Sequence, residues 1–227
     1  MLTPEQHAEV RLGMITSSRI NTIVYGGYAA LNTLANELRK ERAGNVTPRP
    51  LGVTSGVPAL DWGVNNEDFA AAEFWNRHPE YVMTDPKWVN WHNKTETVFY
   101  QNCGASPDRA LESIGKRPTP LEIKCPYDPD IHKKYRNSMT VPREYLPQVY
   151  WQIMVMNAPG SWFISFDPRE NAQKYRYFEV YVIRDNTYES MILSKVTKFL
   201  ETYLAGESFE PQSQNAASLK EMFGAKK

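Results

Sequence analysis

Apolar residues recur at helical spacing in the first third of the chain. Leu31, Leu34, Ala35 and Leu38 follow the i, i+3, i+4, i+7 pattern of one buried helix face. Three helices are predicted in this part of the chain, over residues 17–25, 28–43 and 59–78. The segment 45–58 between the last two contains prolines and glycines, so we expect a loop there.

From about residue 80 the pattern changes to short apolar runs that are typical of strands. Strands are predicted over residues 97–101, 104–106, 121–124, 162–166 and 175–183. Two more helices are predicted, over residues 142–157 and 188–204. This order of elements predicts an α/β fold of the mixed α+β kind, a central mixed sheet flanked by helices. We expect one domain over residues 1–227, with a loose polar tail from about residue 206.

Composition narrows the class of protein. The 227 residues are 41% hydrophobic, which is enough for a packed core, and no apolar run is long enough to span a bilayer or to form a signal peptide. We therefore expect a cytoplasmic protein without membrane attachment. The two cysteines, Cys103 and Cys125, give neither a disulfide framework nor a zinc pattern. The formal net charge is zero, so charge alone does not indicate a polyanionic partner.

One motif carries specific chemistry. Ser106-Pro107-Asp108 is separated by thirteen residues from Glu122-Ile123-Lys124, a spacing that joins two strands by a turn. Glu122 and Lys124 are two apart on a strand and share a face, and the turn brings Asp108 to the same side. Glu122 stands between Leu121 and Ile123, where a charge must be paired or bind a metal. Two carboxylates and an amine can hold a divalent cation and activate water; the alternative is a turn aspartate and an exposed strand glutamate.

Other polar residues allow two interpretations each. Glu67, on the helix over 59–78, is either a third carboxylate or a solvated helix acid. Gln148 and Gln152 lie on an apolar helix, where an amide needs a partner, either a reacting water or the backbone. Arg11 precedes a Thr-Ser-Ser helix start that ends at Ser18; it suits a terminal phosphate, or it is a surface arginine beside helix caps.

The remaining basic residues are less informative. Lys133, Lys134 and Arg136 can follow a DNA backbone or form a solvated face. The histidines share no metal-ligand spacing and are predicted to be structural or on the surface: His7, His78, His92 and His132.

Five strings in order, from about Arg11 to Tyr203, resemble the bacteriophage lambda exonuclease family of YqaJ-like viral recombinase nucleases, with their PD-(D/E)xK restriction-endonuclease-like core. The strings are Arg-Leu-Gly-Met-Ile-Thr-Ser-Ser, Leu-Asp-Trp-Gly-Val-Asn-Asn-Glu, Gly-Ala-Ser-Pro-Asp, Leu-Glu-Ile-Lys-Cys-Pro and the glutamine-containing helix. The resemblance implies roles for individual residues. Asp108, Glu122, the backbone carbonyl of Ile123 and Glu67 would bind metal.

The same resemblance implies that Lys124 and Gln148 position the attacking water. Arg11, Ser18 and Ser106 would hold the 5′-terminal phosphate. Leu60 falls where the family has an apolar wedge that splits the terminal base pairs. Whether Lys124 acts as a general base or orients the nucleophile stays open.

The activity that the resemblance implies is two-metal, Mg²⁺-dependent 5′-to-3′ exonuclease digestion of linear double-stranded DNA, with Mn²⁺ as a substitute for Mg²⁺. The products would be 5′ mononucleotides and 3′ single-stranded DNA for an annealing recombinase of phage origin. A homotrimeric ring around the DNA is implied too. The alternatives are a restriction-like endonuclease, a non-catalytic DNA-binding protein with a nuclease fold, and an enzyme acting on another phosphate ester.

Overall fold

A five-stranded mixed sheet forms the centre of the protein. The computed structural model describes residues 3–47, 56–84, 88–91 and 102–205. The strands lie in the order β1-β4-β5-β6-β7, and only the pairing of β5 with β6 is parallel. Their bounds are Val82–Thr84 (β1), Arg109–Glu112 (β4), Thr119–Lys124 (β5), Gly160–Phe166 (β6) and Tyr177–Ile183 (β7). A separate antiparallel pair joins β2 (Val89–Asn90) to β3 (Gly104–Ala105).

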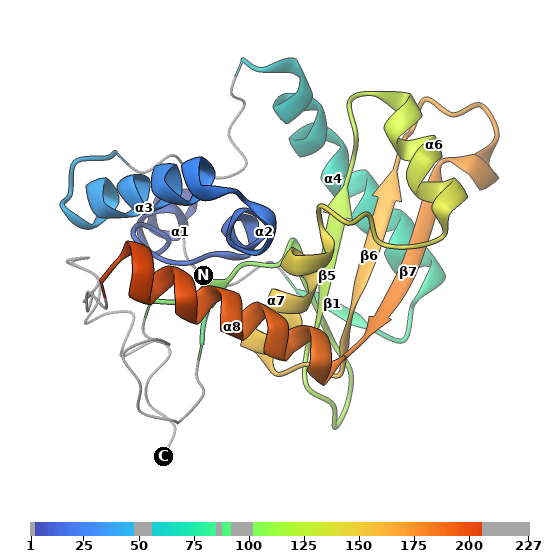
Figure 1. Ribbon diagram of the computed structural model, residues 1–227. Helices are drawn as coiled ribbons and strands as arrows, with labels where there is room; N and C mark the ends of the chain where they lie inside the picture. Colours follow the sequence, from blue (N-terminus) through green and yellow to red (C-terminus); the bar gives the residue numbers. More distant parts are fainter. Residues whose placement is uncertain (1–2, 48–55, 85–87, 92–101, 206–227) are drawn as a thin grey trace.

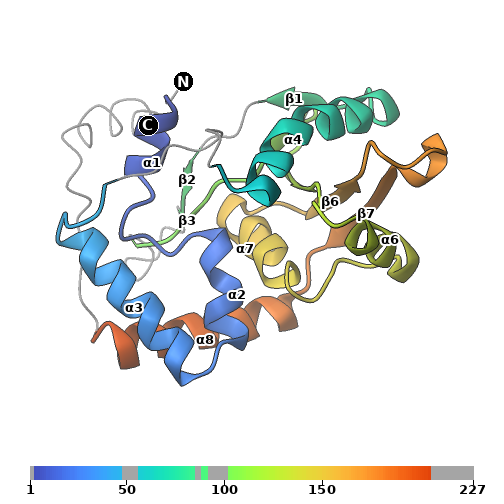
Figure 2. The same ribbon diagram turned by 90° about the horizontal axis from the view of Figure 1, so that it is seen from above.

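Helices cover both faces of the sheet (Figures 1 and 2). Their bounds are Pro4–Glu9 (α1), Ser17–Tyr25 (α2), Tyr28–Arg42 (α3), Pro58–Arg77 (α4), Pro129–Ser138 (α6), Leu146–Met156 (α7) and Asn186–Tyr203 (α8). In Figure 2, α4 lies on one side of the sheet, α6 and α7 on the other, and α2, α3 and α8 beyond α7. A short 3-10 helix, Gln173–Tyr175, precedes β7.

The alternation of side chains along β5 divides the core in two. Leu121 and Ile123 face α4, where they pack in one cluster with Phe74. Glu122, between them, points to the opposite face and meets α7. A strand that is buried on both faces thus brings a carboxylate to the middle of the protein, as the sequence pattern predicted.

Helix α7 is buried nearly all round because it lies between the sheet and the pair α2 and α8. Trp151 is fully buried at its centre, and its indole N–H donates to the carbonyl oxygen of Gly104 at 3.1 Å. Gly104 cannot carry a side chain, because a Cβ there would overlap the indole of Trp88. This packing fixes the segment that leads from β3 to Asp108.

The predicted fold class is confirmed, as are the helices over 17–25, 28–43 and 59–78, within a residue or two. The helix predicted from residue 142 begins instead at Leu146, because Pro142 starts a turn that the amide of Tyr145 closes at 2.9 Å. Helix α6 was not predicted at all. The strand predicted over 97–101 and the tail from residue 206 lie outside the described residues.

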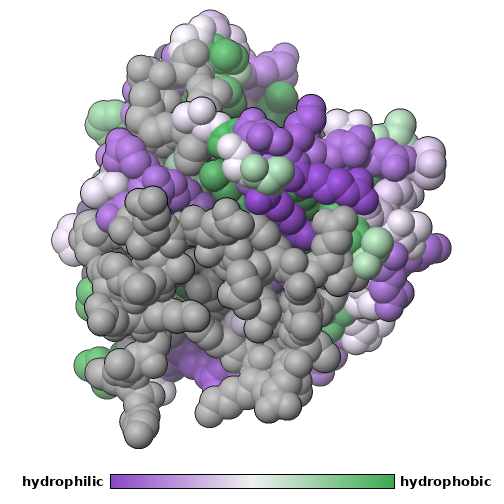
Figure 3. All heavy atoms as spheres, turned by 90° about the vertical axis from the view of Figure 1, so that its left-hand side faces the viewer, coloured by the Kyte–Doolittle hydropathy of each residue, from purple (hydrophilic) through white to green (hydrophobic). Residues whose placement is uncertain are grey.

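On the face shown in Figure 3, hydrophilic residues predominate and hydrophobic ones occur in small groups. No helix in the described part of the chain is both long and apolar enough to cross a membrane.

Candidate active site

The antiparallel pairing of β4 with β5 brings Asp108 to Glu122. Arg109 pairs with Leu121 in the register, so Asp108, one residue before β4, lies beside the end of β5. Its Oδ2 accepts the backbone N–H of Ile123 at 2.7 Å. The structure therefore holds the first carboxylate of the motif against the backbone of the second strand.

Glu122 is fully buried, and both of its oxygens accept hydrogen bonds. Oε1 accepts from Gln148 at 2.5 Å and from the ammonium of Lys124, while Oε2 accepts from Gln152 at 2.6 Å. The strand alternation puts Lys124 on the same face as Glu122, and Gln148 and Gln152 are one helical turn apart on α7. The structure thus brings Asp108, Glu122, Lys124 and Gln148 together.

Electrostatics in this cluster favour an added cation. Burial, and then the negative charge of Asp108, raise the pKa of Glu122 to about 7, against the opposing effects of Lys124 and Gln152. Burial lowers the pKa of Lys124, but Glu122 and Asp108 outweigh it and the net shift is upward, so Lys124 is an ammonium here. Two carboxylates that repel each other across a buried site fit a divalent cation, which prefers such oxygen ligands.

Glu67 approaches from α4, on the other face of the sheet. Its Oε1 accepts from Arg109 at 2.6 Å, and Arg109 also pairs with the exposed Asp68. Burial, and then Asp108, raise the pKa of Glu67, so the two carboxylates are electrostatically coupled. Among the described residues, however, no three His, Cys, Asp or Glu side chains are grouped closely enough to hold a metal ion. In the position in which Arg109 holds it, Glu67 does not complete a set of metal ligands with Asp108 and Glu122.

A second group of polar side chains lies next to the carboxylates. An isolated bridge between Ile15 and Cys103 brings the start of α2 beside the segment that leads to Ser106. The Ser106 hydroxyl is 2.7 Å from Nε2 of His7. At the start of α2, Ser18 bonds to Thr16 at 3.0 Å.

Arg11 faces the same region. Burial and the nearby Arg19 lower the pKa of the guanidinium, while Asp108 and Glu122 act in the opposite direction, which places Arg11 within their field. No hydrogen bond of the Arg11 side chain to another described residue is present. A partly buried cation with donors that no described residue uses can bind an anion.

Leu60 lies on the first turn of α4 and is 54% exposed. Trp62 lies two residues after Leu60, and the guanidinium of Arg169 stacks over its ring at 4.2 Å. Arg169 is itself ion-paired with the buried Asp167 at 2.8 Å. These contacts tie the start of α4 to the segment after β6, so Leu60 is presented on an anchored helix end.

His7 was predicted to be structural or on the surface, and the structure shows it buried and hydrogen-bonded to Ser106. Burial, and then Arg11, lower its pKa from 6.5 to about 4. Between these two values the unfolded chain binds a proton that the folded protein does not, so stability falls as the pH decreases from about 6.5 to about 4.

We therefore expect His7→Gln to flatten this acid-side loss of stability. The free energy of unfolding is measured by urea titration at several pH values. The slope of this free energy against pH should be smaller in the variant than in the wild type, by at most ~1.4 kcal/mol per pH unit, and the difference shrinks to the extent that water reaches the ring. At pH 8, where His7 is neutral in both states, the difference in unfolding free energy between the two proteins measures only the cost of the changed packing. Parallel curves for the two proteins would contradict the assignment.

Comparison with known proteins supports the family resemblance. The sequence profile of the YqaJ-like viral recombinase domain matches residues 6–159, more than half of the chain. No curated protein matches.

Solved structures show the same fold. The alkaline exonuclease LHK-Exo from Laribacter hongkongensis gives a TM-score of 0.73 at 23% identity, over 88% of this chain and 93% of that one. LHK-Exo in complex with dAMP gives a TM-score of 0.74 at 21% identity, and the alignment covers 95% of this chain and 98% of that one. A phage-related exonuclease from Haemophilus somnus 129PT gives a TM-score of 0.56 at 11% identity, and the alignment covers 84% of this chain and 93% of that one.

Proposed function

Because the chain belongs to the lambda-exonuclease-like family of YqaJ viral recombinase domains, we propose that it is a Mg²⁺-dependent 5′-to-3′ exonuclease on linear double-stranded DNA. Family and fold together support a nuclease. The observation that carries the finer proposal is the convergence of Asp108, Glu122, Lys124 and Gln148, with the partly buried Arg11 in the field of the two carboxylates.

Asp108 and Glu122 would hold Mg²⁺ or Mn²⁺, with the Ile123 carbonyl and Glu67 as the further ligands that the family resemblance implies. The metal, when bound, supplies Lewis-acid stabilisation of phosphate charge and lowers the pKa of water. Binding has a structural requirement, because both oxygens of Glu122 already accept hydrogen bonds from side chains. Lys124 or Gln148 must move off Oε1 for that oxygen to become a ligand.

The other side chains then have distinct tasks. Lys124 is an ammonium, which suits orientation of the nucleophilic water and stabilisation of charge on the phosphate more than proton abstraction. Gln148, released from Glu122, can hold the same water through its amide. Arg11, Ser18 and Ser106 would bind the 5′-terminal phosphate, which sets the register for release of 5′ mononucleotides. Leu60 would separate the terminal base pairs.

Three further features of the proposal concern partners and place of action. The 3′ single strand would pass to a single-strand annealing recombinase during phage-type DNA recombination. The protein would act as a homotrimeric ring, since a ring keeps hold of DNA by topology rather than by net positive charge. It would work in the cytoplasm of a bacterial host.

Digestion of linear and covalently closed duplexes of the same sequence tests the proposal. With Mg²⁺, the linear DNA should be degraded and the closed circle left intact, and EDTA should stop the reaction. Cleavage of the circle would favour a restriction-like endonuclease. Binding of DNA without cleavage, in Mg²⁺ or Mn²⁺, would favour a non-catalytic protein.

Gln152 is expected to position Glu122 in this reaction. It is fully buried, donates to Oε2 of Glu122 at 2.6 Å, and leaves its own Oε1 buried without a partner among the described residues. Gln152→Met keeps the volume and removes both the donor and the unsatisfied oxygen. The rate should fall about tenfold to a hundredfold, as for other residues behind metal ligands.

The melting temperature of Gln152→Met should change little, because loss of a hydrogen bond is offset by loss of an unsatisfied buried acceptor. A Mg²⁺ titration of the rate would show a weaker apparent affinity for the metal. Wild-type turnover and Mg²⁺ dependence in this variant would show that Gln152 has no positioning role.

A further inference from the structure

An exposed arginine lies at the edge of the candidate active site and has no acidic partner among the described residues. Arg143 belongs to the turn before α7, and its guanidinium stacks over the ring of Tyr25 at 4.6 Å. Tyr25 is the last residue of α2. The contact therefore joins the far end of α2 to the start of α7.

The charge of Arg143 is not neutralised by any described residue. Its neighbour Glu144 accepts from the hydroxyl of Tyr135 at 3.2 Å, and no ion pair of Arg143 with the described residues is present. By contrast, Arg19 and Arg184 are paired with Glu41 and Glu189. Arg143 thus keeps its N–H donors available to an anion in solution.

The ring under Arg143 is fixed in place. The hydroxyl of Tyr25 is 2.9 Å from that of Tyr188, whose ring packs on Tyr150 with 4.5 Å between centroids. A guanidinium that lies flat on an anchored aromatic ring loses little further freedom when its edge donates to phosphate oxygens. The stack is therefore a pre-organised phosphate contact rather than a flexible surface charge.

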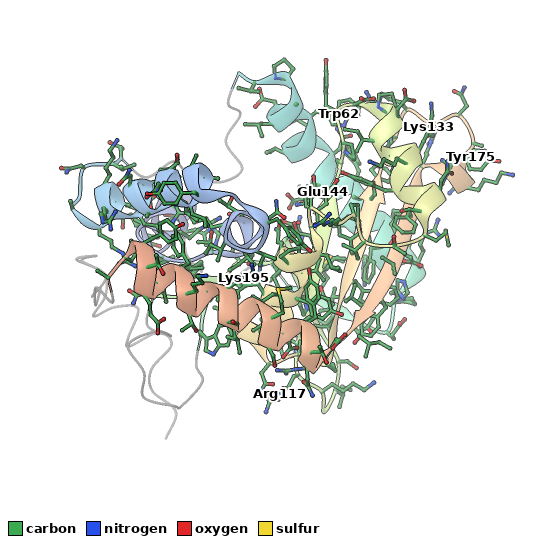
Figure 4. All side chains as sticks on the ribbon, viewed as in Figure 1. Trp62, Arg117, Lys133, Glu144, Tyr175 and Lys195 are labelled. Carbon is green, nitrogen blue, oxygen red and sulfur yellow. The ribbon has the colours of Figure 1, made fainter. Side chains whose placement is uncertain are left out.

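Arg143 stands close to the reacting groups. Tyr145 is two residues after Arg143, and the centre of its ring lies 5.0 Å from the Lys124 ammonium. Figure 4 shows its neighbour Glu144 between the helices α1–α3 on one side and α4 with β5 on the other. Helix α2, which begins at Ser17 beside the proposed phosphate pocket, spans about 12 Å to Tyr25 at 1.5 Å per residue.

We infer that Arg143, held by Tyr25, binds a backbone phosphate of the DNA substrate a few nucleotides inward from the end that Arg11 holds. Arg11 and Arg143 together would then define the position of the duplex relative to the carboxylates. This inference rests on the proposed function, and it identifies a DNA contact on a segment that the sequence motifs do not include.

The test is the salt dependence of DNA binding. Arg143→Gln and the wild type, both carrying Lys124→Ala to prevent cleavage, are titrated with a 5′-phosphorylated fluorescent duplex between 50 and 200 mM salt, roughly the range in which phosphate contacts are lost. The slope of log Kd against log salt should fall by about one for Arg143→Gln, and Kd should rise about threefold to tenfold at the lower salt concentration.

Arg117→Gln is the matched control, because Arg117 is an exposed arginine on the turn between β4 and β5 (labelled in Figure 4), whereas Lys124 is the last residue of β5. It should leave both the slope and Kd unchanged. Tyr25→Leu should reproduce part of the effect of Arg143→Gln, and Tyr25→Phe, which keeps the ring, should have a smaller effect.

Two results would overturn the inference. Equal salt slopes for Arg143→Gln, Arg117→Gln and the parent protein would refute it while leaving the proposed exonuclease in place. Failure of the parent protein to bind duplex DNA under any of these conditions would refute both.

Discussion

Lys124→Ala is expected to lower the rate of DNA cleavage by about 10²- to 10³-fold or more and to leave the fold intact. Its ammonium is bound to Glu122 and lies in the field of Asp108, so it is the cation nearest the proposed reaction centre. Folding should be largely spared, because Gln148 and Gln152 still donate to Glu122, and this carboxyl can take up a proton.

Turnover of linear duplex and thermal unfolding, measured on the same preparations, separate the two effects. Lys133→Ala is the matched control, since it removes an exposed lysine on α6 (labelled in Figure 4), which forms an ion pair with Asp130. Normal activity in Lys124→Ala would remove Lys124 from the mechanism. A collapse of the melting temperature would make its role structural.

Arg11→Gln is expected to abolish the preference for a 5′ phosphate. Arg11 is a partly buried guanidinium within the field of Asp108 and Glu122, so a bound phosphate would be held by a charge-assisted contact that is partly shielded from water. Loss of such a contact should lower the rate on 5′-phosphorylated ends about a hundredfold, towards the rate on 5′-hydroxyl ends. The measurement is kcat/KM on the two substrates, which differ only in the terminal phosphate.

The 5′-hydroxyl duplex is the internal control of this experiment, because its rate should change little in Arg11→Gln. An equal loss on both substrates would indicate that Arg11 supports the carboxylates rather than the phosphate. If kcat/KM on both substrates, and therefore their ratio, stayed at the wild-type values, Arg11 would be excluded from the phosphate site.

The meeting of Asp108 with Glu122 and Lys124 could be predicted from the sequence because it depends on local rules. Alternation along one strand puts Glu122 and Lys124 on one face, and a short turn between antiparallel strands brings Asp108 beside them. The helices over 28–43 and 59–78 were predicted for a similar reason, since their apolar spacing lies within one segment.

Other contacts depend on segments that are distant in the sequence, and these could not be predicted from local patterns. His7 meets Ser106 only because the bridge between Ile15 and Cys103 joins two separate parts of the chain. Gln152 was indistinguishable from Gln148 in sequence, since both are amides on an apolar helix, and the structure shows that Glu122 binds both.

Helix α6 was missed because its sequence is polar and its stability comes from tertiary contacts. His132 is fully buried and bonds to Ser165 at 2.8 Å and to the carbonyl oxygen of Tyr175 at 2.8 Å. Its helix start relies on Asp128 as a cap, at 2.9 Å from the amide of Asp130. A cap followed by a buried histidine is too weak a pattern to predict a helix by itself.

The order in which labelled ends are released tests the central claim most directly. A linear, 5′-phosphorylated duplex carries one fluorophore on the base of a 5′-terminal nucleotide, which leaves its 5′ phosphate free, and a different fluorophore at a 3′ end. It is digested with Mg²⁺ by the wild type and by Lys124→Ala. The account predicts that the wild type releases the 5′ label first, as a mononucleotide, while the 3′ label stays on single-stranded DNA, and that Lys124→Ala releases neither. Release of the 3′ label first, or of both labels on long fragments, would contradict a 5′-to-3′ exonuclease.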